Sequence, residues 1–115
     1  MKKLAMILFA AVALTAFAAD TTVKGHLVDL ACAQEEGQKD GFGASHTKDC
    51  LQMADCVKSG YGVLTADKKI VRFDAAGNEK AKKFIADLKQ AKDIKVAVTG
   101  TQNGSSMTVN KIELQ

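Results

Sequence analysis

Short alternations of apolar and polar residues place the main constraint on how this chain can fold. The side chains of a β-strand point alternately to its two faces, so a strand with one buried face shows apolar residues at every second position. Alternation or a short apolar run occurs in five segments, which are residues 22–30, 61–65, 70–73, 94–99 and 107–114. Polar turns at residues 66–69 and 102–105 join two pairs of these segments into predicted hairpins. The sequence therefore predicts a mainly β protein.

One segment has the period of an amphipathic helix instead. Its apolar residues recur at spacings of three and four and so share one helical face; they are Ala81, Phe84, Ile85, Leu88 and Ala91. Asn78 is the expected N-cap of this helix. A second, short helix is expected over residues 47–58, whereas the polar residues 33–45, which include three glycines, predict a long loop.

The order of these elements indicates the architecture. Five strands with the main helix between the third and the fourth is the order of an OB-type barrel, in which closure removes most exposed strand edges. We therefore expect a mainly β fold with one or two helices, built as a five-stranded OB-like barrel. An open α+β sheet with one packed helix fits the same order, and the sequence leaves that alternative open.

The beginning of the chain has the pattern of a secretion signal. Met1-Lys2-Lys3 is basic, residues 4–17 form an apolar run without a charge, and Ala16-Phe17-Ala18 offers small residues for cleavage. The run is shorter than the ~20 apolar residues that a membrane-spanning helix needs. We expect residues 1–18 to be removed, which leaves a periplasmic or secreted protein with no membrane attachment.

The remaining 97 of the 115 residues suffice for one domain and one modest core. We assign residues 19–115 to a single OB-like domain with a Cys/His-bearing loop and short helix at 31–59. Loss of Lys2 and Lys3 lowers the formal net charge from +3 to +1. No stripe of basic residues with interleaved aromatics remains, so nucleic acid is not an expected partner.

The residues that could carry chemistry are three cysteines and one histidine: Cys32, His46, Cys50 and Cys56. In an oxidising compartment two thiols should pair, and a bridge from the first strand to the short helix would stabilise the domain by roughly 3 kcal/mol. Three thiolates and one imidazole also form a ligand set that suits zinc or copper. A catalytic or redox thiol is the third interpretation.

Helix geometry favours one bridge. On a continuous helix, Cys50 and Cys56 stand about 9 Å apart along the axis and about 120° apart around it, so they cannot pair. Cys32 is then one half of any bridge, and Cys50 lies at the centre of the apolar arc whereas Cys56 lies at its margin. We expect a Cys32–Cys50 disulfide and a free Cys56. A helix broken near Met53 would remove the basis of this choice.

The other polar residues have simpler interpretations. His26 shares the polar face of its strand with Lys24 and is expected to be exposed. Asp29 is expected to cap the turn that leads to Cys32. We interpret His46 as a solvated or capping residue, although under the metal hypothesis it or Asp29 would complete or support the ligand set.

Together these segments resemble a known group of proteins. Residues 25–32 (GHLVDLAC), His46, Cys50, residues 56–65 (CVKSGYGVLT) and residues 96–100 (VAVTG) resemble small exported bacterial domains of unknown function. Those domains share a G-x-[VI]-x-D-x-x-C strand end, a His/Cys/Cys segment and a V-x-V-x-G strand. The resemblance covers nearly all of residues 19–115 and implies an exported OB-like domain without a known activity.

Enzyme motifs are missing from the sequence. It contains no G-x-S-x-G, H-E-x-x-H, C-x-x-C or P-loop pattern. We therefore expect a non-enzymatic binding or structural module, stapled by a disulfide and without a cofactor, whose partner is a small ligand or another protein. The alternative is a periplasmic metal-binding protein that holds zinc or copper with its Cys/His ligands.

Overall fold

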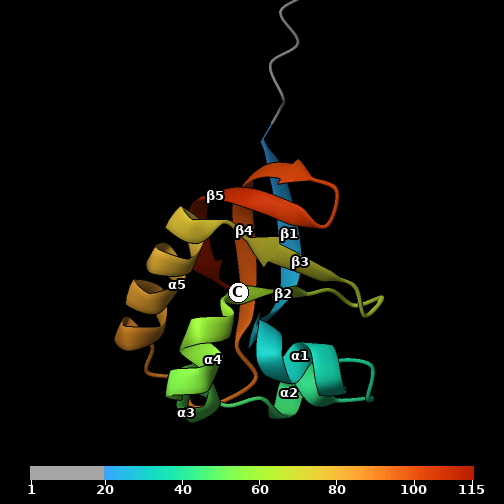
Figure 1. The fold of residues 1–115 in the computed structure, drawn as a ribbon, viewed down its shortest axis with the longest axis vertical. Coiled ribbons are helices and arrows are strands. Elements are labelled where there is room, and N and C mark those ends of the chain that lie inside the picture. The colour runs from blue at the N-terminus through green and yellow to red at the C-terminus, as the bar shows by residue number, and fades with distance from the viewer. Residues whose placement is uncertain (1–19) are drawn as a thin grey trace, which may run out of the picture.

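The computed structural model describes residues 20–115, and the expected signal at residues 1–18 lies outside them. Within the described residues the chain forms a compact α+β fold with a five-stranded mixed sheet and five short helices (Figure 1). The expectation of one or two helices was therefore too low. No helix of the described residues has the length and apolar character needed to cross a membrane.

The five strands lie where the alternation predicts them. They are β1 (Thr21–Asp29), β2 (Tyr61–Leu64), β3 (Ile70–Phe73), β4 (Lys95–Asn103) and β5 (Ser106–Leu114). The hydrogen-bonded order is β1-β2-β3-β5-β4, and β4 pairs with β1, so the order is closed. All neighbours are antiparallel except β3 and β5, which are parallel. The β4–β5 hairpin is tighter than expected because Gly104, with φ of 62°, permits a short turn.

The main helix, α5 (Ala75–Asp87), begins earlier than predicted. The N-cap of α5 is Asp74, whose side chain accepts a hydrogen bond from the Gly77 N–H at 2.8 Å. The prediction that Asn78 caps this helix was wrong. Asn78 lies inside the helix, where its Oδ1 accepts a hydrogen bond from the Tyr61 N–H at 2.9 Å. The apolar period extends to Ala91, but the backbone is already extended at Leu88, so the helix also ends earlier.

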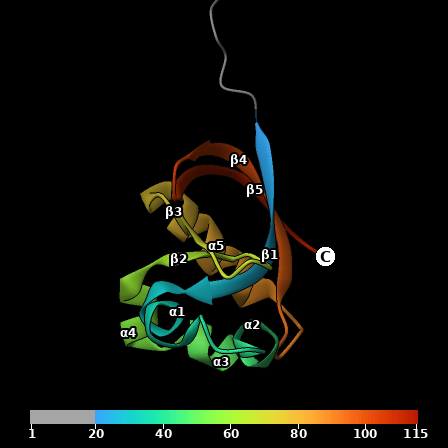
Figure 2. The same cartoon turned by 90° about the vertical axis from the view of Figure 1, so that its right-hand side faces the viewer.

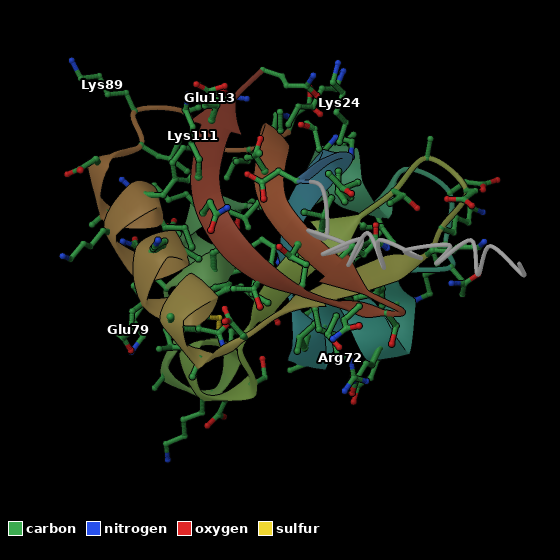
Figure 3. All side chains as sticks on the ribbon, turned by 90° about the horizontal axis from the view of Figure 1, so that it is seen from above. Lys24, Arg72, Glu79, Lys89, Lys111 and Glu113 are labelled. Carbon is green, nitrogen blue, oxygen red and sulfur yellow. The ribbon has the colours of Figure 1, made fainter. Side chains whose placement is uncertain are left out.

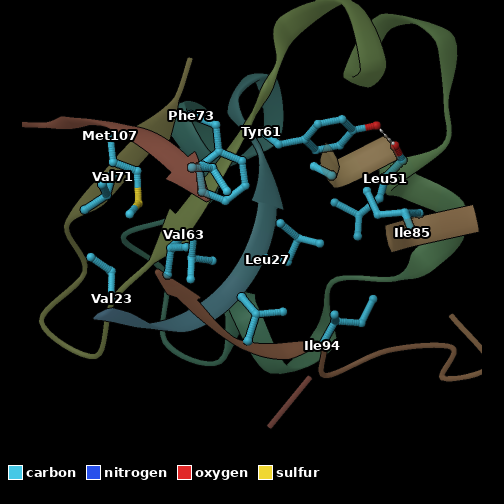
Figure 4. Close-up of a cluster of buried hydrophobic side chains, with 14 of the residues drawn as sticks. Val23, Leu27, Leu51, Tyr61, Val63, Val71, Phe73, Ile85, Ile94 and Met107 are labelled. Carbon is cyan, nitrogen blue, oxygen red and sulfur yellow. Dashed lines mark hydrogen bonds between the residues drawn. The ribbon is translucent and has the colours of Figure 1, made fainter. Parts of the chain in front are cut away.

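The main core fills the space between the strands and α5. Buried side chains come from every strand and from the helix. They include Leu27, Val63, Val71, Met107 and Ile85 (Figure 4), and also Val96 on β4. The Tyr61 hydroxyl donates a 2.6 Å hydrogen bond to the Leu51 carbonyl at the edge of this core. The charged side chains labelled in Figure 3 extend outward from the fold instead.

Four short helices lie together at one end of the sheet (Figure 2). They are α1 (Leu30–Glu36), α2 (Phe42–Ser45), α3 (Lys48–Leu51) and α4 (Ala54–Ser59), and we call residues 30–59 the helical cap. The prediction of one long loop over residues 33–45 was wrong. Gly37 is the C-cap of α1, Gly41 precedes α2, and Gly43 lies inside α2.

The single helix expected over residues 47–58 was also wrong. Thr47 caps α3 by accepting a hydrogen bond from the Cys50 N–H at 3.1 Å. Gln52 is the C-cap of α3, the backbone is extended at Met53, and α4 starts a new helix at Ala54. Because of this break, the relative orientation of Cys50 and Cys56 does not follow a continuous helix.

Candidate thiol–carboxylate site

Asp29 is the centre of the site, at the junction between β1 and α1. Its side chain is fully buried. One carboxylate oxygen, Oδ2, accepts a hydrogen bond from the Cys32 N–H at 2.9 Å, which confirms the expected cap. The other oxygen, Oδ1, lies 2.6 Å from Nε2 of His46. A buried carboxylate is costly unless it is paired and hydrogen-bonded, and Asp29 is both.

His46 differs from its expected place at the surface. It is only 7% exposed, and its ring lies against Phe42 with the ring centroids 4.8 Å apart. His46 is buried because α2 turns the chain back beneath β1. The sequence had predicted a loop at this place. The expectation of a solvated His46 was wrong, because the residue is the buried partner of Asp29. The alternative of a capping residue holds at the backbone, since His46 is the C-cap of α2 and its N–H donates to the Phe42 carbonyl at 2.9 Å.

Cys56 and Cys32 complete the cluster. Cys56 on α4 is buried, whereas Cys32 on α1 is half-buried. Their Sγ atoms lie 4.1 Å apart. Both sulfurs and a carboxylate oxygen of Asp29 lie within 4.8 Å of one another. Three potential ligand atoms thus meet between two helices and the end of a strand.

Two hydrogen bonds hold the helices that carry these thiols. The Leu30 N–H donates to the Gly60 carbonyl at 2.9 Å, and the Ala31 N–H donates to Ser59 Oγ at 3.1 Å. The start of α1 is therefore fixed to the end of α4. The sequence carried one signal for this contact, the polar Ser59-Gly60 pair directly before β2, but nothing in it identified the partner.

The structure groups the expected site residues differently from the sequence. Cys50 is half-buried and lies outside the cluster of Asp29, Cys32 and Cys56. The expectation that Cys50 is the buried cysteine and Cys56 the marginal one was wrong, since it assumed an unbroken helix. All three cysteines are free thiols in the structure. The expected Cys32–Cys50 bridge stays a prediction, while the fold brings Cys56 next to Cys32.

The electrostatics of the cluster centre on an ionised carboxylate. Burial by itself raises the pKa of Asp29, but hydrogen bonds from His46, the Cys32 N–H and Cys56, together with the charge of His46, outweigh it and lower the pKa to about 2. Burial, followed by the negative charge of Asp29, raises the pKa of Cys56 to about 12 and also raises the pKa of Cys32. Both thiols are therefore protonated near neutral pH.

This protonation limits what the thiols can do. The thiolate is the nucleophile of cysteine chemistry, and reactive cysteines have lowered pKa values. Cys32 and Cys56 have the opposite shift, so the cluster is poorly suited to nucleophilic catalysis. The proximity of two sulfurs and a carboxylate, rather than their protonation, is what suits the cluster to holding a metal ion or forming a disulfide, and in both cases the thiols lose their protons as the new bonds form.

A second histidine–aspartate pair lies apart from this cluster. His26 Nε2 is 2.7 Å from Asp93 Oδ1, and the His26 ring lies directly under Gly43, where a Cβ would come within 2.4 Å of Nδ1. His26 is half-buried, so the expectation of an exposed residue was wrong. The hydrogen bond from His26 lowers the pKa of Asp93. This pair connects β1 to the residues before β4, and α2 lies on the His26 ring through Gly43.

A surface hollow at the end of α5 is also separate from the cluster. It has a volume of about 650 Å³ and is lined by the end of α5, the residues after it, and Leu114. None of the cluster residues contributes to it. The thiol–carboxylate cluster is therefore the candidate site. Comparisons of this chain with protein-family models, with curated proteins and with solved structures find no match.

Proposed function

We propose that this protein is an exported, non-enzymatic module that binds a zinc-class divalent metal ion through Asp29, Cys32 and Cys56. The observation that carries the proposal is the meeting of two sulfurs and a carboxylate oxygen within 4.8 Å of one another. All three residue types are established zinc ligands. The set shares Cys32 and Cys56 with the ligands expected from the sequence, and it replaces Cys50 with Asp29.

The spacing of the sulfurs supports this proposal. Two sulfurs bound to a tetrahedral zinc ion at ~2.3 Å stand about 3.8 Å apart. Cys32 and Cys56 are 4.1 Å apart, so metal binding requires only a small approach of α1 and α4. Cys32 is half-buried and provides a path from solvent to the site.

The mixture of donors favours one class of metal. Thiolates disfavour calcium and magnesium, which take oxygen ligands. A carboxylate oxygen favours zinc over copper(I), which prefers soft sulfur donors alone. Three protein ligands leave a fourth tetrahedral position for water or for an atom of a partner.

His46 orients the carboxylate. Outer hydrogen bonds to ligand residues commonly fix their orientation and strengthen metal binding. The 2.6 Å contact between His46 Nε2 and Asp29 Oδ1 leaves Oδ2 facing the start of α1.

We also propose that the scaffold is an OB-like barrel. The closed strand order, the parallel β3–β5 pair, and α5 between β3 and β4 support this assignment. Export rests on the signal pattern of residues 1–18. The barrel positions β1 so that its last residue, Asp29, meets the helical cap.

The test is metal titration of the reduced protein without tags that bind metal. Zinc binding is measured by native mass spectrometry, and cadmium is used as a probe because cadmium–thiolate bonds absorb in the ultraviolet. We expect one bound ion. Because Cys56→Ser and Asp29→Asn each remove a ligand, they should lower the affinity by more than the 10–100-fold typical of losing an outer hydrogen bond. Cys50→Ser is the matched control and should bind like the wild type. No binding, or equal losses in Cys50→Ser and Cys56→Ser, would refute the proposal.

A further inference from the structure

We propose that oxidation joins Cys32 to Cys56 in a disulfide, so that the same two thiols hold either a metal ion or a covalent bridge. This inference rests on the proposed function and adds its regulation. It also replaces the partner that the sequence favoured for Cys32, because Cys56 and not Cys50 belongs to the cluster.

The geometry needs little change for the bridge to form. A disulfide has a sulfur–sulfur distance of about 2 Å, so the Cys32 and Cys56 sulfurs, at 4.1 Å, must approach by roughly the same amount. Side-chain rotation and a small shift of α1 against α4 supply such a movement. The hydrogen bonds from Leu30 and Ala31 to the end of α4 keep the two helices together while the thiols react.

The oxidant is a disulfide compound of the exported compartment, either a small molecule or a thiol oxidase. Cys32, the more exposed thiol of the pair, loses its proton and attacks one sulfur of the oxidant, which releases one thiol and leaves a mixed disulfide. Cys56 then loses its proton and attacks the Cys32 sulfur, which releases the second thiol. Two electrons pass to the oxidant, and the two protons end on the released thiols.

The two states exclude each other. Zinc binds cysteine as a thiolate, and neither sulfur of a disulfide is a thiolate. A bound ion in turn removes both thiols from exchange with an oxidant. Asp29 keeps its contacts with His46 and the Cys32 N–H in the reduced, metal-free protein. The helical cap therefore holds its place without either the metal ion or the disulfide.

The experiment oxidises the reduced protein with glutathione disulfide, with and without zinc. Bridge formation is followed by intact mass and by non-reducing peptide mapping after alkylation. We expect a Cys32–Cys56 bridge in the zinc-free protein, and about hundredfold slower formation when free zinc is about 100 times its Kd, since only the empty fraction reacts. Cys50→Ser should behave like the wild type, and Cys32→Ser should form no intramolecular bridge between positions 50 and 56.

The outcomes separate the two proposals. A protein that binds zinc in the reduced form but never forms the Cys32–Cys56 bridge overturns this inference and leaves the proposed function standing. A Cys32–Cys50 bridge, or a Cys32–Cys56 bridge that forms equally fast with zinc bound, also overturns it. A protein that forms the Cys32–Cys56 bridge without any affinity for zinc overturns the proposed function, and the exclusion of metal by oxidation fails with it.

Discussion

Asp29 and His46 form a buried pair, with Asp29 Oδ1 2.6 Å from His46 Nε2, that connects the end of β1 to the segment between α2 and α3. The second oxygen of the same carboxylate caps α1. One ionised side chain therefore holds two parts of the helical cap on the strands. The stability of the helical cap, residues 30–59, should therefore depend on the negative charge of Asp29.

Acid should weaken the fold through Asp29. Its pKa is about 2 in the folded protein, below the ordinary value of 3.8. A lowered folded pKa contributes stability that is fully present above the ordinary value and is lost as the pH falls toward the folded one. The shift corresponds to about 2 kcal/mol. Urea unfolding at pH 6 and near pH 2 should show this loss in the wild type.

Two variants isolate this contribution. Asp29→Asn should be less stable at pH 6 and should lose less stability on acidification than the wild type, because it has no carboxylate to protonate. Asp49→Asn, a change at an exposed position, should follow the wild type. If Asp29→Asn loses as much stability in acid as the wild type does, the paired carboxylate is not the acid-sensitive group.

Alkylation should distinguish the three cysteines in the reduced, metal-free protein. Cys56 is 6% exposed, and its pKa is about 12. At pH 8 only about one Cys56 in ten thousand is then a thiolate, the form that reacts. We expect iodoacetamide to modify Cys56 last in the native protein and all three cysteines together in urea. Peptide mapping that finds Cys56 modified as fast as the half-buried Cys50 would contradict the buried cluster.

The packing of α5 can be tested by a pair of truncations. Ile85 is 1% exposed, whereas Phe84 is only partly buried at the edge of the core. Ile85→Ala should cost about 2–5 kcal/mol of unfolding free energy, and Phe84→Ala should cost less. The exposed Lys83→Ala should change stability by no more than about 0.5 kcal/mol. Chemical denaturation measures all three, and a larger loss for Phe84→Ala than for Ile85→Ala would reverse the assignment.

Gly100 marks a close approach between β4 and β5. The strand register shifts between Thr99 and Gly100, and a Cβ at Gly100 would lie 1.9 Å from the Thr108 carbonyl oxygen. Gly100→Ala must displace backbone, so we expect a loss of about 1–3 kcal/mol or more. Ser105→Ala, in the exposed hairpin turn, should be neutral. A Gly100→Ala protein as stable as the wild type in denaturant would show that the strands can separate at this point.

Export can be tested independently of the structure. The sequence predicts cleavage after Ala18. When the full chain is expressed in a Gram-negative host, N-terminal sequencing of the periplasmic fraction should therefore begin at Ala19. A protein that retains Met1 and stays in the cytoplasm would contradict both the signal and the oxidising environment on which the disulfide depends.

Local pattern determined the strands and the existence of the main helix. Alternation has a period of two residues, and it placed all five strands within a few residues because each pattern is read within one segment. The role of Asp29 as the cap before Cys32 was readable for the same reason, since the hydrogen bond spans three residues. Helix boundaries were less accurate, because Asp74 and Asn78 are both suitable caps and only packing against Tyr61 distinguishes them.

Tertiary structure alone decided the site. A helical wheel drawn through residues 47–58 assumes a continuous helix, and the break at Gln52 and Met53 invalidates it. That break turns Cys56 toward Cys32, 24 positions away in the sequence, and leaves Cys50 outside the cluster. The burial of His46 likewise depends on β1 and α2 meeting in space. The periodicity of one segment cannot predict such contacts. They form only when segments far apart in the sequence pack together to bury apolar surface and to pair a buried charge.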